Sequence, residues 1–211
     1  MRITHLGHAC VLLETPAARL LVDPGTYAEG FEDLRGLDAV LITHQHPDHA
    51  DPERLPALVA ANPGAQLLAD EDSVPVLAGM GVTARAVRPG DHLTVAGAEL
   101  DVAGGTHAVI YADRPGCTNV AYAVDGGAFF HPGDSLTVPP GAVDVLAVPA
   151  SGPWLKLAEA IDYLRAVAPR VAVPVHERTM ASTRMAYAML AEFAPAGTQF
   201  RPLPTGVAAT V

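Results

Sequence analysis

Three histidines and one aspartate lie within six consecutive residues, directly after an apolar run, and this cluster constrains the chain most strongly. The run covers residues 38–43 and has the composition of a buried β-strand, and the cluster is His44-Gln45-His46-Pro47-Asp48-His49. Neutral imidazoles are the commonest protein ligands of zinc and similar ions, and a carboxylate adds negative charge. A loop that leaves a rigid strand can direct the first two histidines at one ion, and the aspartate with the last histidine at another. The cluster therefore predicts a site for two metal ions, against the alternative of a polar loop that happens to be rich in histidine.

The rest of the chain has the pattern of short strands with single helices between them. Apolar runs and turn residues predict strands over residues 3–14, 18–23, 38–43, 65–69, 82–87, 92–95, 98–103, 119–124, 128–130, 143–148 and 171–175. Helical patterns cover residues 52–61, 73–78, 155–167 and 179–193. This order predicts a layered α/β architecture with one mixed sheet or two sheets, and the pattern alone leaves the topology open. No internal repeat or low-complexity linker interrupts the 211 residues, so we expect a single domain over residues 1–211.

Acidic residues outnumber basic ones, which argues against nucleic acid as a partner. The chain has 13 Lys and Arg against 23 Asp and Glu, a formal charge of -10, and Lys156 is its one lysine. Binding along a phosphate backbone needs a basic face. The uncharged stretches are too short for a membrane span, and the first residues lack the apolar run of a secretion signal. Two cysteines do not make a disulfide framework, so we expect a cytoplasmic protein.

The histidine cluster, preceded by Thr43, resembles the signature Thr-His-x-His-x-Asp-His of the metallo-β-lactamase superfamily. The resemblance implies a four-layer αββα sandwich of the α/β class, with the metal site at one edge between two sheets. Residues 7–14 and the Pro-x-His at residues 174–176 look most like one subgroup. That subgroup is related to L-ascorbate-6-phosphate lactonase and to the phospholipase D that hydrolyses N-acylphosphatidylethanolamine.

The resemblance also implies which later residues complete the metal site. His107 matches the third ligand of the first metal, although its context is Thr-His-Ala where many members have Gly-His-Thr. Asp134 matches the aspartate that bridges both metals, and His176 matches the last ligand of the second metal. The alternatives are His92 in place of His107, an aspartate that caps a turn, and a histidine hydrogen-bonded at the end of a sheet. The implied ligands are His44, His46, Asp48, His49, His107, Asp134 and His176.

Further residues are implied to act around the metals. Asp23 matches an aspartate that orients ligands rather than binding metal, although Asp-Pro-Gly is also a good turn sequence. His8 resembles a histidine found near the site in one subgroup, so it contacts the site or the substrate, or it simply packs. For an anionic substrate, the candidate contacts are Arg114, Lys156 and Arg178, each of which could equally be an ordinary surface cation. Trp154 either lines a pocket or packs in the core.

The resemblance implies a metal-dependent hydrolase. Two divalent ions can hold a bridging hydroxide that attacks the substrate, with Asp48 orienting it. We expect two ions, zinc first with manganese or iron as alternatives, and a small ester, lactone, amide or phosphodiester as substrate. The alternatives are a nuclease and a metal-stabilised binding module without catalysis, while di-iron redox chemistry lacks room for a flavin domain. Classical β-lactam hydrolysis is disfavoured because those enzymes typically have cysteine at the position of Asp134. The oligomeric state stays open.

Overall fold

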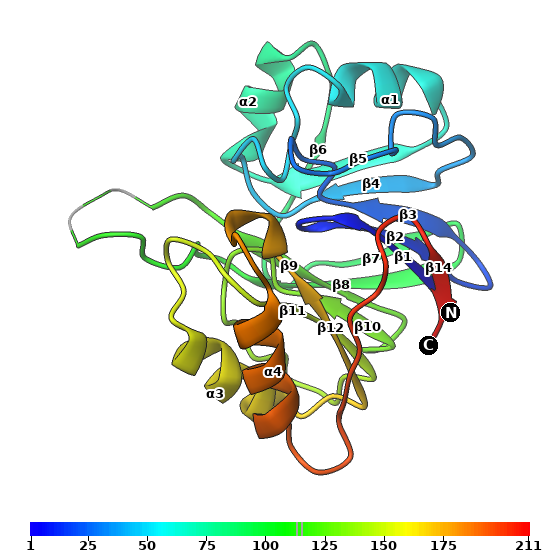
Figure 1. Cartoon of the computed structure of the whole chain (residues 1–211). Coiled ribbons are helices and arrows are strands. Elements are labelled where there is room, and N and C mark those ends of the chain that lie inside the picture. The colour runs from blue at the N-terminus through cyan, green and yellow to red at the C-terminus, as the bar shows by residue number, and fades with distance from the viewer. Residues whose placement is uncertain (113, 115) are drawn as a thin grey trace.

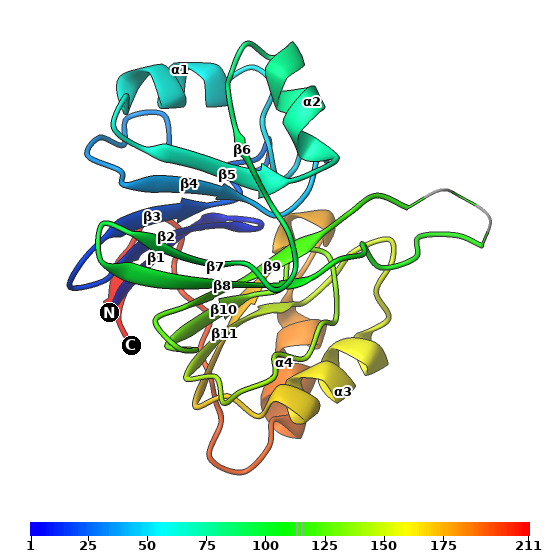
Figure 2. The ribbon, with the colours of Figure 1, turned by 180° about the vertical axis from the view of Figure 1, so that it is seen from behind.

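Two β-sheets face each other, and a pair of helices covers the outer face of each sheet. The computed structural model describes residues 1–112, 114 and 116–211. Figures 1 and 2 show α1 and α2 on one side of the paired sheets and α3 and α4 on the other. This arrangement confirms the expected four-layer αββα sandwich.

The first sheet is built almost entirely from the N-terminal part of the chain. The first three strand pairs in its order are antiparallel and the last three are parallel. Its strands, in spatial order, are β14 (Ala208–Thr210), β1 (Arg2–Gly7), β2 (Cys10–Glu14), β3 (Arg19–Val22), β4 (Ala39–Ile42), β5 (Gln66–Asp70) and β6 (Arg85–Val87).

The second sheet repeats this mixture of three parallel and three antiparallel pairs. Its strands, in spatial order, are β13 (Gln199–Phe200), β12 (Val171–Val175), β11 (Val145–Pro149), β10 (Phe129–His131), β9 (Val120–Val124), β8 (Ala98–Gly104) and β7 (His92–Val95). The central strands are apolar along their whole length, as expected for strands buried on both faces.

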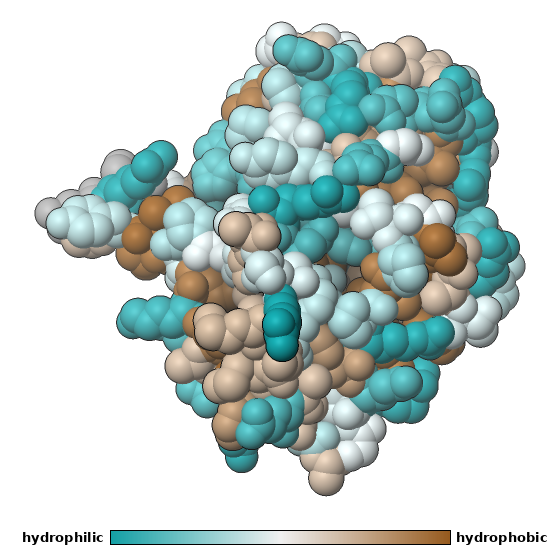
Figure 3. Space-filling model, viewed as in Figure 1, coloured by the Kyte–Doolittle hydropathy of each residue, from teal (hydrophilic) through white to brown (hydrophobic). Residues whose placement is uncertain are grey.

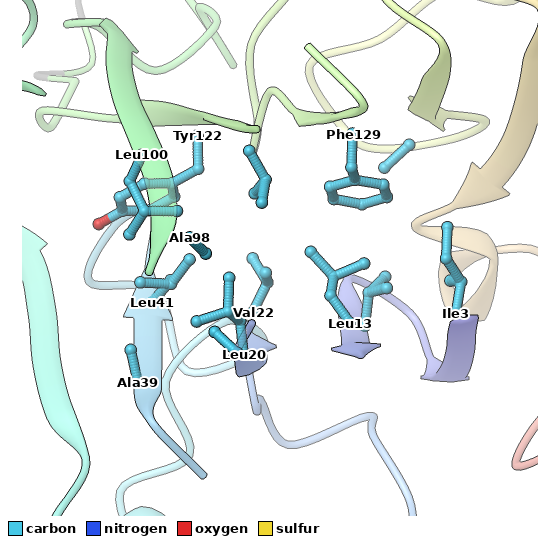
Figure 4. Packing of buried hydrophobic residues seen from close by; sticks show 14 of the residues in the cluster. Ile3, Leu13, Leu20, Val22, Ala39, Leu41, Ala98, Leu100, Tyr122 and Phe129 are labelled. Carbon is cyan, nitrogen blue, oxygen red and sulfur yellow. The ribbon is translucent and has the colours of Figure 1, made fainter. Parts of the chain in front are cut away.

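The helices pack on the sheets through separate apolar clusters. One cluster lies between the first sheet and α1 (Leu55–Ala61) and α2 (Ser73–Gly79). Another joins the second sheet to α3 (Leu157–Val167) and α4 (Arg184–Phe193), and a short 3₁₀ helix, η1 (Glu177–Thr179), precedes α4. The third and largest cluster lies between the two sheets, where Figure 4 shows side chains from both sheets meeting. Because this interface is apolar, polar ligands can gather only at its edge, where the loops leave the strands.

Two sequence predictions of secondary structure are wrong. The predicted strand over residues 3–14 is two strands, because Gly7 and His8 take left-handed φ angles of 99° and 55° and reverse the chain. The predicted helix over residues 179–193 is α-helical only from Arg184, since Thr179 is the last residue of η1 and residues 180–183 are not helical. The first difference matters for function, since it puts His8 at the tip of a turn rather than inside a strand.

Candidate metal centre

Loops from both sheets bring eight side chains that could bind metal ions together at one edge of the sandwich. The first sheet contributes the β1–β2 turn and the loop after β4, and the second sheet contributes segments after β8, β10 and β12. Within each of two groups, the ligating atoms lie within 4.8 Å of one another. The first group is His44, His46, His107 and Asp134, and the second is His8, Asp48, His49 and His176. The structure thus brings together all seven residues that the resemblance implied as ligands, and it adds His8.

Two glycines let the backbone approach closely enough to form this edge. A Cβ on Gly25 would lie 1.8 Å from the carbonyl oxygen of Asp48, so a side chain there would push the histidine loop away. A Cβ on Gly133 would lie 2.4 Å from Oδ1 of Asn119, and Gly133 has a φ of 61°. The segments that carry the Asp-Pro-Gly turn and Asp134 therefore depend on glycine for their position.

Asp23 lies beneath the histidine loop and is completely buried. Its Oδ2 accepts hydrogen bonds from Nδ1 of His49 and from the hydroxyl of Thr43, both at 2.7 Å, and its Oδ1 accepts the backbone N–H of Thr43 at 2.8 Å. A carboxylate accepts only, so His49 carries its proton on Nδ1 and leaves Nε2 free to face the cluster. This is the contact that an orienting aspartate requires.

Asp134 lies between the two ligand groups. Its Oδ1 is 3.1 Å from Nε2 of both His49 and His176. Its Oδ2 is 3.3 Å from Nε2 of His107 and 4.0 Å from Nε2 of His44. One carboxylate oxygen thus faces each group, so Asp134 is placed where it could contribute to both.

The unpartnered polar atoms of the cluster fit metal ions. Among the described residues, the buried side-chain atoms without a hydrogen-bond partner include His8 Nδ1, His49 Nε2, His107 Nε2, Asp134 Oδ1, and both ring nitrogens of His176. Leaving a buried polar atom unsatisfied costs about 1–3 kcal/mol, and a protein rarely gathers several in one place without a ligand. A divalent cation would satisfy the imidazole nitrogens and the carboxylate together, so these residues suit a metal ion.

The electrostatics of the cluster also favour cations. Burial alone would raise the pKa of Asp134, but the neighbouring His49 and His176 hold it well below its usual range. Burial would lower the pKa of His49, but Asp134 and Asp23 raise it well above its usual value. The negative charge of Asp134, which faces Nε2 of His49 and favours a proton there, would favour a metal ion at that nitrogen in the same way. Burial lowers the pKa of His44, which keeps that imidazole neutral and able to bind metal.

His8 and Asp48 form a pair at the open side of the cluster. Nε2 of His8 lies 3.1 Å from Oδ2 of Asp48. Burial would raise the pKa of Asp48, but the hydrogen bond from His8 and the charge of His49 outweigh it and lower the pKa. Asp48 keeps about a quarter of its side chain exposed, at 24%, so it stays ionised and reachable from solvent.

Several residues around the site were not predicted from the sequence. Glu177 accepts the backbone N–H of His8 at 3.1 Å, and Asn119 accepts the backbone N–H of Asp134 at 2.9 Å. Tyr27 packs its ring edge-on to His8, with ring centroids 5.1 Å apart. Two of these residues could have been predicted from the sequence. Asn119 directly precedes a predicted strand core, and Glu177 directly follows the candidate ligand His176.

The four predicted substrate contacts occupy different positions. Arg114 lines a cavity of about 330 Å³ that also touches the ligands His46 and His107. Lys156 pairs with Glu159 at 3.5 Å and, with Trp154, lines a separate cavity of about 270 Å³. Arg178 pairs with Glu29 and Glu177. Trp154 is almost fully buried and donates its indole N–H to Oδ2 of Asp134 at 2.7 Å.

The segment between β8 and β9 forms the outer wall of the Arg114 cavity. Its described residues extend away from the body of the molecule in Figures 1 and 2. Val109 and Tyr111 on this segment are strongly exposed, and Figure 3 shows apolar side chains at its base. From this segment the cavity is lined by the apolar side chains of Val109 and Ile110 together with the cationic Arg114, and it meets His46 and His107 on its inner side.

The sandwich and its two ligand groups define a class of protein: a metal-dependent hydrolase with the metallo-β-lactamase fold. The family model described as beta-lactamase superfamily domain, Lactamase_B_3, matches residues 2–176. The chain therefore belongs to the metallo-β-lactamase superfamily.

Known proteins resemble the chain in sequence and in structure. The Mycobacterium tuberculosis protein Rv0786c is 47% identical over 216 residues, which cover 100% of both chains. A UPF0173 metal-dependent hydrolase from Mesorhizobium japonicum is 30% identical over 161 residues, covering 70% of this chain and 65% of that protein. The solved structure of Igni18, a metallo hydrolase from Ignicoccus hospitalis, has a TM-score of 0.75 at 19% identity and covers 99% and 97% of the two chains. This last likeness concerns the fold. None of the helices in the described residues combines the length and hydropathy needed to cross a bilayer.

Proposed function

We propose that the chain holds two divalent metal ions, one in each ligand group, and hydrolyses a small ester, lactone, amide or phosphodiester. The observation that carries the proposal is the position of Asp134, which turns one oxygen toward each group. A carboxylate in that position can bridge two ions, and a pair of ions suits hydrolytic displacement. We propose that residues 1–211 form one catalytic domain.

The proposed ligands divide between the two groups. The first ion would be held by three imidazoles, and the second by two imidazoles and a carboxylate, with Asp134 common to both. Asp23 would hold His49 in the tautomer that binds metal, which its short hydrogen bond supports. The proposed ligands are His44, His46 and His107 for the first ion and Asp48, His49 and His176 for the second.

Asp48 and His8 have the proposed catalytic roles. Two divalent ions bound here would supply a hydroxide nucleophile from water near neutral pH and would polarise the reacting oxygen of the substrate. The partly exposed carboxylate of Asp48 can orient the attacking water and accept its hydrogen bond. His8 keeps that carboxylate ionised and aligned through its own hydrogen bond at 3.1 Å.

Arg114 is the proposed contact for a negatively charged group of the substrate. It shares its cavity with His46 and His107, so a substrate anchored there would reach the ligand groups directly. Lys156 and Arg178 are further proposed contacts, although each already pairs with a glutamate. The cavity of about 330 Å³ suits a small molecule rather than a polymer.

Zinc is the proposed metal, with manganese or iron as alternatives, because imidazole-rich ligand sets suit zinc. The proposed subgroup is that of the lactonase and the phospholipase named above, supported by residues 7–14 and 174–176. A cytoplasmic location is supported by the free thiols of Cys10 and Cys117.

Elemental analysis of gently purified protein tests the proposal. We expect about two metal ions per chain, falling in the His46→Ala and Asp134→Ala variants, with loss of metal-dependent turnover in both. His92→Ala is the matched control, because this histidine is exposed and paired with Asp101 and Glu99 away from the centre.

A panel of esters, lactones, amides, phosphodiesters and RNA then identifies the bond that is cleaved. Turnover of RNA alone would favour a nuclease, against which the charge of -10 argues. Metal binding without any turnover would favour a binding module. Near-normal turnover in both ligand variants would reject the metal centre.

A further inference from the structure

The carboxylate of Asp134 has one neighbour that cannot bind a metal ion. Its oxygens contact the four histidines described above and the indole N–H of Trp154. An indole N–H donates only and has no lone pair for a metal. Among the described residues, Trp154 is therefore the one contact of this carboxylate whose effect is restricted to orientation.

The indole itself is held firmly. Trp154 is 7% exposed, and its ring lies edge-on to ligands of both groups, with centroids 6.1 Å from His107 and 6.0 Å from His176. It also lies directly over Gly152, where a Cβ would come within 2.9 Å of the indole nitrogen. Held among these neighbours, the indole directs its N–H toward Oδ2 of Asp134.

The backbone at Asp134 is fixed independently of the indole. Its N–H donates to Asn119, and the preceding Gly133 donates to Nδ1 of His131. These contacts fix where the side chain begins, but not how its carboxylate plane is turned. The 2.7 Å hydrogen bond from Trp154 reaches the carboxylate itself and, beside the histidine contacts at 3.1–3.3 Å, restricts that rotation.

We propose that Trp154 is a positioning residue of the metal centre, which turns the Asp134 carboxylate so that one oxygen faces each ligand group. This inference rests on the metal centre proposed above. An uncharged donor has a specific advantage here. Arginine or lysine would orient the carboxylate too, but would add positive charge that repels the ions.

The proposal makes the two metal positions unequal. Oδ2, on the side of His107, shares its lone pairs with the indole N–H, whereas Oδ1, on the side of His49 and His176, does not. Removing the donor frees the carboxylate to rotate, and partners of this kind typically contribute about 10–100-fold in metal affinity.

Zinc affinity of the metal-free protein tests the proposal, measured by competition with a chelator. We expect Trp154→Phe, which keeps an aromatic ring but lacks the donor, to bind zinc about 10–100-fold more weakly. Gly152→Ala retains the tryptophan but displaces its ring, and should weaken zinc binding in the same direction.

Tyr163→Phe is the matched control, since its hydroxyl donates to the backbone carbonyl of Thr137 and not to the side chain of a candidate ligand. It should bind zinc within about twofold of the parent, since it leaves the partners of the ligands intact. Circular dichroism of each metal-free variant establishes that the chain is folded.

A spectroscopic signature separates orientation from general packing. The chain has one tryptophan, so the ¹⁵N-labelled protein gives one indole N–H resonance. That resonance should move when zinc is added and when Asp134 is replaced by asparagine, because both change the acceptor.

Zinc binding by Trp154→Phe equal to that of the parent, or an indole resonance unmoved by both changes, would overturn the positioning role while leaving the metal centre intact. A parent that binds no zinc, manganese or iron would overturn the centre and this inference with it.

Discussion

Nδ1 of His49 lies 2.7 Å from Oδ2 of Asp23, and both side chains are completely buried. The contact joins the loop after β4 to the Asp-Pro-Gly turn that follows β3. His49 of the second ligand group is therefore held by a residue outside its own loop. A negative charge in that position orients the imidazole and makes its other nitrogen a stronger metal ligand.

Asp23→Asn should therefore weaken metal binding without removing any ligand. The amide keeps the shape but loses the charge, and we expect zinc affinity to fall about 10–100-fold in chelator competition. Asp51→Asn is the control for losing a buried carboxylate, because Asp51 pairs with Arg54 rather than with a ligand. Equal effects of the two substitutions would contradict the orienting role.

Gly25→Ala should disrupt the histidine loop. The added methyl would lie 1.8 Å from the carbonyl oxygen of Asp48, so the loop must move or the chain must unfold. We expect a loss of about 3 kcal/mol or more in the free energy of unfolding, together with reduced metal content. Gly64→Ala has open space around its Cβ and should stay within about 0.5 kcal/mol of the parent. Urea denaturation of the two variants measures both values.

Arg114 and Lys156 should differ in their effect on an anionic substrate. Arg114 shares a cavity with His46 and His107, whereas Lys156 is exposed and paired with Glu159. Once a substrate is identified, Arg114→Ala should raise KM for an anionic substrate about tenfold or more and leave a neutral one nearly unchanged. Lys156→Ala should change KM much less. Equal effects of Arg114→Ala on neutral and anionic substrates would reject recognition through charge.

Asp70→Asn should change how stability depends on pH. Burial raises the pKa of Asp70 to about 6 from an ordinary value near 4. Between pH 4 and 6 the folded chain keeps this proton while the unfolded chain has lost it, so raising the pH lowers the free energy of unfolding. Asparagine does not titrate. As the pH rises from 4 to 6, the free energy of unfolding of the variant should therefore increase relative to that of the parent by up to about 3 kcal/mol. Above pH 6 the difference between the two should stay constant.

Urea unfolding of metal-free parent and Asp70→Asn at pH 4.5 and 7.5 measures this difference. The variant keeps an oxygen that can accept the backbone N–H groups of Asp72 and Ser73, so those contacts need not be lost. A difference between variant and parent that is the same at both pH values would show that Asp70 does not titrate in this window.

Local patterns predicted short strands with single helices between them and the histidine cluster, whereas the four-layer sandwich and the later cluster members His107, Asp134 and His176 were implied by the resemblance to the metallo-β-lactamase superfamily. Strand periodicity and the spacing of His44, His46 and His49 can be read within a few residues. The turn at His8 was missed because residues 3–14 are mostly strand-forming and Gly7 is the one turn-favouring residue among them. The hydrogen bond from Trp154 to Asp134 joins the loop between β11 and α3 to the loop after β10, and no local pattern in the sequence predicts that contact.

Each ligand group contains residues from both sheets. The second sheet supplies His107 and Asp134 to the first group and His176 to the second group, and the first sheet supplies the other members of each. Neither sheet on its own retains a full set of ligands for either ion. A fragment, a circular permutant or a folding intermediate with only one sheet formed would therefore have low metal affinity. Tight metal uptake would mark the moment at which the two halves of the chain have docked correctly.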